Sequence, residues 1–132
     1  MTRSENMARI RGRDTVPEKR VGAVLRRLGL GYRKHVSSLP GTPDFANRRL
    51  GWAIFVHGCF WHRHVGCRRA TTPSTRPEYW IPKLIGNTQR DKSNTKRLMN
   101  LGLRVIVIWE CETIDTEVVQ YILEREKIYI VD

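Results

Sequence analysis

The sequence predicts one mixed α/β domain, in which a single β-sheet carries helices on its faces. Helical and strand patterns follow one another in the order α-β-β-β-α-β-α, which favours helices packed on a shared sheet. Two apolar runs, at residues 52–57 and 103–109, are typical of buried central strands. The chain has 132 residues, a length that suits one hydrophobic core. Because it shows no internal repeat or linker, we expect a single domain over residues 1–132.

The N-terminal region predicts a basic arm followed by a helix. Residues 1–14 are rich in arginine, and Met7 and Ile10 are their only sizeable apolar side chains, so we expect an arm that orders on a partner. A helix begins at Thr15, which can cap the first amides, and Glu18 three residues later completes a capping box. The apolar side chains of this helix recur at helical spacing, at Val21, Val24, Leu25 and Leu28.

Three strands are expected next, over residues 30–36, 44–48 and 52–57. Residues 58–76 carry His, Cys, Gly, Pro and Arg without helical or strand periodicity. Long irregular segments of this kind are usually functional or held in place by another group.

A long helix is expected over residues 78–101, broken near Pro82 or Gly86. The rest of the pattern predicts a strand over 103–109, a final helix marked by residues 118–123 and a short edge strand over 128–131.

The formal net charge of +11 is concentrated in one half of the chain. Residues 1–76 hold 16 Lys and Arg against four Asp and Glu, whereas the remaining residues hold eight against nine. This asymmetry favours a nucleic-acid partner over a merely basic soluble protein. The arginines expected to contact phosphates are Arg3, Arg9, Arg11 and Arg13 in the arm and Arg63, Arg68 and Arg69 further along. Since no apolar run approaches the roughly 20 residues of a membrane span, we expect a cytoplasmic protein without a membrane partner.

Three cysteines and a histidine form a candidate metal site. Cys59, His64 and Cys67 fall within nine residues, and Cys111 follows the strand that ends at Trp109. Thiolate and imidazole are the ligands that Zn²⁺ prefers, and four of them leave no open position, so we expect a structural zinc ion. The alternative is three ordinary buried thiols.

A second cluster predicts phosphodiester chemistry. Asp44 begins one expected strand, and Val56 and His57 end the next, so pairing of the two strands as a hairpin would bring them together. A carboxylate and a backbone carbonyl are oxygen ligands that Mg²⁺ accepts, and a nearby histidine can activate water. Each residue also has a purely structural interpretation, as a turn cap for Asp44, a buried polar group for His57 and a capping acid for Glu18.

Several motifs resemble one known family. The run from Ile54 to His62 (IFVHGCFWH), followed by His64 and Cys67, resembles the signature of the Vsr very-short-patch-repair DNA mismatch endonucleases. Further motifs match the same family in order: Leu39–Phe45 (LPGTPDF), Arg76–Trp80 (RPEYW), Arg90-Asp91 and Val107–Cys111 (VIWEC). The resemblance covers about residues 3–111.

The resemblance implies a restriction-endonuclease-like core that nicks duplex DNA 5′ to the thymine of a T:G mismatch, which arises when 5-methylcytosine deaminates. It implies that Asp44 is the metal-binding acid and that Val56 binds Mg²⁺ through its backbone carbonyl. It makes His62 the general base and gives His57 and Glu18 supporting catalytic roles. It also makes Cys59, His64, Cys67 and Cys111 the ligands of a structural Zn²⁺.

The resemblance also implies a way of reading the mismatch. Phe60, Trp61 and Trp80 would enter the base stack from one side, and Met7 of the arm from the other. Asp91 matches a recognition contact. The alternative for the aromatic side chains is core packing, which is what we expect of Trp52 and Trp109 because they lie in apolar strands.

Two departures bear on the metal site. Family members often have Thr where Val56 stands, a change that a backbone carbonyl ligand survives. In the wider endonuclease fold a second metal-binding acid is usual where Phe55 stands and a lysine where His57 stands, so Asp44 would hold more of the metal by itself.

We therefore expect a Mg²⁺-dependent, zinc-stabilised endonuclease that acts on T:G mismatches as a monomer. A restriction-type endonuclease that cuts intact sites, and a non-catalytic zinc-stabilised DNA-binding module, are the alternatives.

Overall fold

The computed structural model describes residues 14–129. The expected arm, with Met7, lies outside the described residues except for Asp14. Among the residues described, no helix is both long enough and apolar enough to cross a membrane.

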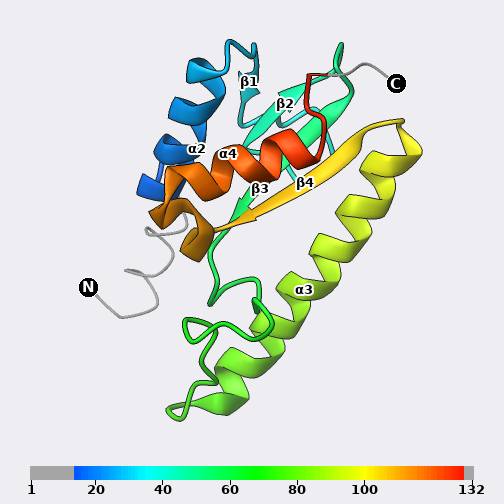
Figure 1. The fold of residues 1–132 in the computed structure, drawn as a ribbon. Helices are drawn as coiled ribbons and strands as arrows, with labels where there is room; N and C mark the ends of the chain where they lie inside the picture. Colours follow the sequence, from blue (N-terminus) through cyan, green and yellow to red (C-terminus); the bar gives the residue numbers. More distant parts are fainter. Residues whose placement is uncertain (1–13, 130–132) are drawn as a thin grey trace.

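A four-stranded mixed sheet forms the centre of the molecule (Figure 1). Its strands lie in sequence order: β1 (Arg33–Lys34), β2 (Phe45–Asn47), β3 (Trp52–His57) and β4 (Arg104–Trp109). The β1–β2 and β2–β3 pairs are antiparallel, whereas β3 and β4 are parallel. The β2–β3 pair is the hairpin pairing that would bring Asp44 to the end of β3. The α/β class and the mixed sheet are confirmed.

Helices cover both faces of the sheet (Figure 1). They are α2 (Val16–Arg27), α3 (Pro77–Asn100) and α4 (Thr116–Arg125), and a 3₁₀ helix, η1 (Glu110–Ile114), leads into α4. The α2 and α4 helices pack on one face and the C-terminal half of α3 on the other. The N-terminal half of α3 extends beyond the sheet, beside the loop that follows β3.

The alternation of side chains along β3 explains these layers. Trp52 and Ile54 enter the core shared with α2 and α4, whereas Ala53 and Phe55 face the opposite side, where Leu98 of α3 packs. Both faces of β3 are therefore covered, which is why its sequence is apolar almost throughout.

Three expectations about the elements are wrong in detail. The strand predicted over residues 30–36 is reduced to β1, whose two residues are exposed at the edge of the sheet. The α3 helix is not broken at Pro82 or Gly86. A proline inside a helix removes one hydrogen bond and crowds the carbonyl four residues earlier. Trp80 and Leu84, on either side of Pro82, are buried in one apolar cluster that offsets this cost. Residues 128 and 129 form a turn rather than an edge strand, and the rest of that prediction lies outside the described residues.

Candidate active site and metal centre

The β2–β3 hairpin places Asp44 against the end of β3. The Oδ2 atom of Asp44 accepts a hydrogen bond from the Val56 N–H at 2.7 Å. Burial raises the pKa of Asp44 to about 7; the Val56 N–H opposes this shift, and the neighbouring Glu18 adds to it. A carboxyl group in such surroundings favours a nearby cation, because a positive charge would offset the loss of hydration.

A pocket of about 400 Å³ opens at this end of the sheet. All four predicted catalytic residues line it, together with Val56 and Asp91: they are Asp44, His62, His57 and Glu18. These side chains come from α2, the start of β2, the end of β3 and the following loop. The structure thus brings together predicted catalytic residues that are up to 44 positions apart along the chain, from Glu18 to His62.

Two imidazole rings stack beside the pocket. The ring centroids of His57 and His62 are 3.8 Å apart and the rings are nearly parallel, at 6°. Burial, with a smaller contribution from His62, lowers the pKa of His57 to about 3, so His57 is neutral at physiological pH. Its Nδ1 atom is buried and has no hydrogen-bond partner among the described residues. A buried ring nitrogen of this kind can bind a ligand in the pocket.

The second ring of the stack is held by a carboxylate. Nδ1 of His62 lies 2.6 Å from Oδ2 of Asp91, which projects from α3. This contact defines the orientation of the His62 ring and supports the tautomer in which Nε2 is free to accept a proton. Asp91 therefore contacts His62 directly, a relation that the spacing of the sequence does not reveal.

His35, for which the sequence predicts no role, contacts the carboxylate of Glu18. His35 Nε2 lies 2.9 Å from Glu18 Oε2, and the same oxygen accepts the Asp14 N–H at 2.9 Å. Thr15 caps α2 as expected, through a 3.4 Å bond from the Glu18 N–H. The predicted capping box is wrong in its other half, because the Glu18 carboxylate accepts the N–H of Asp14 instead of that of Thr15. No local pattern could have identified His35, because its contact with Glu18 depends on how β1 lies relative to α2.

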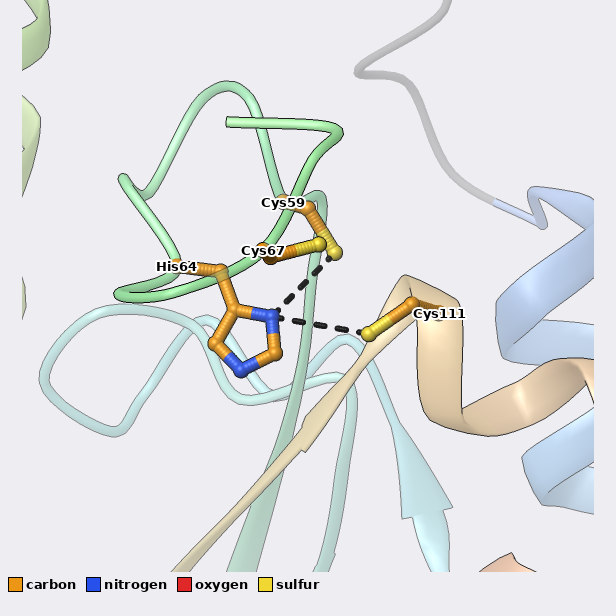
Figure 2. A group of neighbouring side chains, drawn as sticks. All are labelled: Cys59, His64, Cys67 and Cys111. Carbon is orange, nitrogen blue, oxygen red and sulfur yellow. Dashed lines mark hydrogen bonds between the residues drawn. The ribbon is translucent and has the colours of Figure 1, made fainter. Parts of the chain in front are cut away.

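Figure 2 shows the candidate metal centre, in which four side chains point toward one another. Cys59, His64 and Cys67 belong to the loop after β3, and Cys111 belongs to η1. Their ligand atoms all lie within 4.8 Å of one another. The Cys59 and Cys111 sulfurs are 3.6 and 3.5 Å from His64 Nδ1.

This donor set fits a tetrahedral zinc ion. Zinc bonds of about 2.3 Å to sulfur and about 2.0–2.1 Å to nitrogen place sulfur and nitrogen ligands roughly 3.6 Å apart. Both sulfur–nitrogen distances agree with that value. Burial raises the pKa of Cys59 to about 12 and also raises that of Cys111, so a bound metal ion would displace thiol protons.

Comparisons with known proteins identify the family of this chain. Residues 1–69 match the family model described as DNA mismatch endonuclease Vsr. The chain is 46% identical over 110 residues to the DNA mismatch endonuclease Vsr of Escherichia coli K12, and the match covers 83% of this chain and 70% of that protein. This chain belongs to the Vsr family.

Two further relatives of this Vsr-family chain are named as type II nicking enzymes. One, from Xanthomonas oryzae pv. oryzae, is 46% identical over 111 residues, which cover 83% of this chain and 79% of that protein. The other, from Neisseria meningitidis serogroup A, is 36% identical over 110 residues, which cover 83% of this chain and 78% of the relative.

In this Vsr-family chain the predicted wedge residues form one aromatic cluster between the loop after β3 and α3. Trp61 and Trp80 are buried, with 7% and 6% of their surface exposed, and Leu84 packs with them. Phe60 is half-buried and makes T-shaped ring contacts with both Trp61 and Trp80. The structure therefore brings the three aromatic residues together, but it encloses two of them.

Trp109 differs from its predicted role. Trp52 is fully buried in the core as expected, whereas Trp109 is only half-buried. Trp109 is the last residue of β4 and lies at the end of the sheet. Its ring stacks on His64, with ring centroids 4.2 Å apart, and makes a T-shaped contact with His57 at 5.2 Å. It links the candidate metal centre to the histidine stack.

Proposed function

We propose that this chain is a Mg²⁺-dependent endonuclease that nicks duplex DNA 5′ to the thymine of a T:G mismatch formed by deamination of 5-methylcytosine. The observation that carries the proposal is the single pocket shared by Asp44, Val56, His57 and the His62–Asp91 pair. Membership of the Vsr family supports the same conclusion.

Asp44 and the Val56 carbonyl would hold the magnesium ion. The Val56 N–H donates a hydrogen bond to Oδ2 of Asp44. Because the Asp44 carboxyl group is buried, its ionised form favours a neighbouring positive charge. A bound Mg²⁺ would polarise the scissile phosphate and stabilise the leaving oxygen.

His62 would act as the general base. Because Asp91 holds Nδ1 of His62, the opposite ring nitrogen, Nε2, is the one that would take a proton from the attacking water. Asp91 also stabilises the imidazolium that results. His57 remains neutral, and its unpartnered Nδ1 would hydrogen-bond to a phosphate oxygen.

A structural zinc ion on Cys59, His64, Cys67 and Cys111 would order the loop after β3. That loop presents Phe60, the most accessible of the three wedge residues. We propose that Phe60 enters the mismatched step first and that Trp61 and Trp80 follow as the aromatic cluster opens. A mismatched step resists this unstacking less than a paired one does. Met7 of the arm would enter from the other side.

The decisive experiment compares duplexes of one sequence with and without a single T:G pair. Each strand is labelled separately, and each reaction is run with and without Mg²⁺. We expect one nick in the thymine strand of the mismatched duplex, in the presence of Mg²⁺ only. Asp44→Ala should abolish nicking and leave binding to the duplex nearly unchanged, and light scattering should give the mass of a monomer.

Two other outcomes would contradict this proposal. Cutting of the matched duplex at an equal rate would indicate a restriction-type endonuclease. Tight, salt-sensitive binding without cleavage of any duplex would indicate a zinc-stabilised DNA-binding module.

A further inference from the structure

We propose that His35 is a positioning residue that holds Glu18 against Asp44, so that the two carboxyl groups present one cation-binding pair to the pocket. The inference rests on the proposed function, because it concerns how the chain would hold its divalent cation. His35 itself does not line the pocket, whereas Glu18 and Asp44 both do.

His35 makes hydrogen-bonding contacts with both Glu18 and Asp44. Its Nε2 atom lies 2.9 Å from Oε2 of Glu18, and its backbone N–H donates to the Asp44 carbonyl at 3.0 Å. Burial is the larger cause of the rise in the pKa of Asp44, and the Glu18 carboxyl group is close enough to Asp44 to contribute to that rise. One residue thus connects the first turn of α2 with the start of β2.

The backbone of His35 is in an unusual conformation. Its φ of 46° lies in the left-handed region, which disfavours residues with a Cβ atom. Although β1 ends at Lys34, backbone hydrogen bonds continue past it toward the residues that precede β2: after the His35 N–H, the N–H of Val36 donates to the Pro43 carbonyl at 3.1 Å. Strain of this kind persists only where surrounding contacts maintain it, and it is common at functional sites.

Burial makes the His35–Glu18 contact more important than the ion pair beside it. The side chains of His35 and Glu18 are only 11% and 8% exposed, whereas those of the neighbouring pair, Lys34 and Asp14, are 44% and 52% exposed. Exposed pairs contribute little, but removing one partner of a buried pair leaves the other uncompensated.

The arrangement also argues against a separate metal site on Asp14, Glu18 and His35, although their ligand atoms are close enough for one. Lys34 pairs with Asp14, and Nε2 of His35 contacts Oε2 of Glu18, so the ligand atoms of this group already have partners within the chain. The carboxyl groups left to face the pocket are those of Glu18 and Asp44.

The test uses two substitutions that separate backbone strain from the side-chain contact. His35→Gly adopts a positive φ without strain but has no group to reach Glu18. His35→Gln retains a long side chain with an N–H donor. Lys34→Gln is the matched control, because it removes the exposed ion pair on the adjacent residue. The melting temperature of each variant establishes that it is folded.

Two readouts are measured on the full chain, Mn²⁺ binding by electron paramagnetic resonance and the Mg²⁺ concentration that half-saturates nicking of a T:G duplex. In His35→Gly we expect the Mn²⁺ dissociation constant and the half-saturating Mg²⁺ concentration to rise about tenfold, the effect of losing one charge-assisted hydrogen bond. The nicking rate at saturating Mg²⁺ should fall much less. Both values should stay within about threefold of the wild type in His35→Gln and Lys34→Gln.

Wild-type Mn²⁺ affinity in folded His35→Gly would overturn the inference. So would a loss of saturated rate without a change in metal dependence, which is the signature of a merely structural role. If the wild type binds Mn²⁺, His35→Gly loses that binding and neither protein nicks the duplex, the inference stands and the proposed function fails.

Discussion

At the scale of single residues, Asp44 shows how a site that favours a cation also reduces stability. The folded chain keeps this carboxyl protonated up to a pH of about 7, because burial raises its pKa, whereas an unfolded chain releases the proton near its ordinary value of 3.8. Between those values the folded state binds more protons than the unfolded state. Its stability therefore falls as the pH rises through this range.

Asp44→Asn should remove this dependence, because the amide has the same shape and no charge. Without added Mg²⁺, the free energy of unfolding of the variant should exceed that of the wild type by about 1–2 kcal/mol more at pH 8 than at pH 5.5. Urea unfolding at both pH values measures the difference. A constant gap between the two proteins would show that Asp44 is ionised throughout, and Mg²⁺ should stabilise the wild type alone.

Asp91 offers a second test at this scale, because its sequence match and its geometry suggest different roles. Since Asp91 lies 2.6 Å from Nδ1 of His62, we expect Asp91→Asn to lower the nicking rate at saturating DNA about 100-fold or more while leaving the affinity for the T:G duplex unchanged. Single-turnover kinetics and duplex binding measure the two quantities. Weaker binding at an unchanged saturated rate would instead favour the recognition contact.

At the scale of elements, the loop after β3 has little apolar packing of its own, and we propose that a bound metal ion keeps it ordered. Residues 58–76 contain turns and bends but no helix or strand, yet their side chains contribute Phe60, Trp61 and His62 to the site. Three metal-ligand candidates in the loop and one in η1 supply the connection that apolar packing does not.

Removal of the metal should loosen this loop while the sheet persists. We expect the purified chain to contain one zinc ion, measured by elemental analysis, and Cys111→Ser to lose it and to lower the melting temperature by several degrees. Limited proteolysis should then cut within residues 58–76. Asp44→Ala is the control, because it should retain its zinc. A zinc-free wild type with a protected loop would contradict the assignment.

The element boundaries show what local pattern can predict. The β3 strand matches its predicted residues, since both of its faces are covered and every position is constrained. At the edge of the sheet β1 has one neighbouring strand, and there the apolar pattern overestimates the length of the strand. Pro82 was expected to break α3, but the packing of Trp80 and Leu84 against Trp61 outweighs a local preference.

At the scale of the whole molecule, the charge asymmetry predicts how the chain binds DNA. If six or more phosphates are contacted, the logarithm of the binding constant should fall with the logarithm of salt concentration with a slope of about −5 or steeper. Replacing both Arg68 and Arg69, which are exposed in the loop after β3, should reduce the slope by about 2. Arg125→Ala on α4 is the control and should leave the slope unchanged. Fluorescence anisotropy over a salt series gives these values.

The sequence by itself determined the α/β class, the extent of β3, the family and the candidate residues that line the pocket. It could do so because these depend on local apolar pattern, on the spacing of motifs and on residue types that have few chemical uses. Only the tertiary structure decided which residues touch. It placed His35 on Glu18, Asp91 on His62 and Trp109 between two histidines, contacts between elements that lie far apart in the chain. Such contacts depend on the relative placement of packed elements, which no local run of residues encodes.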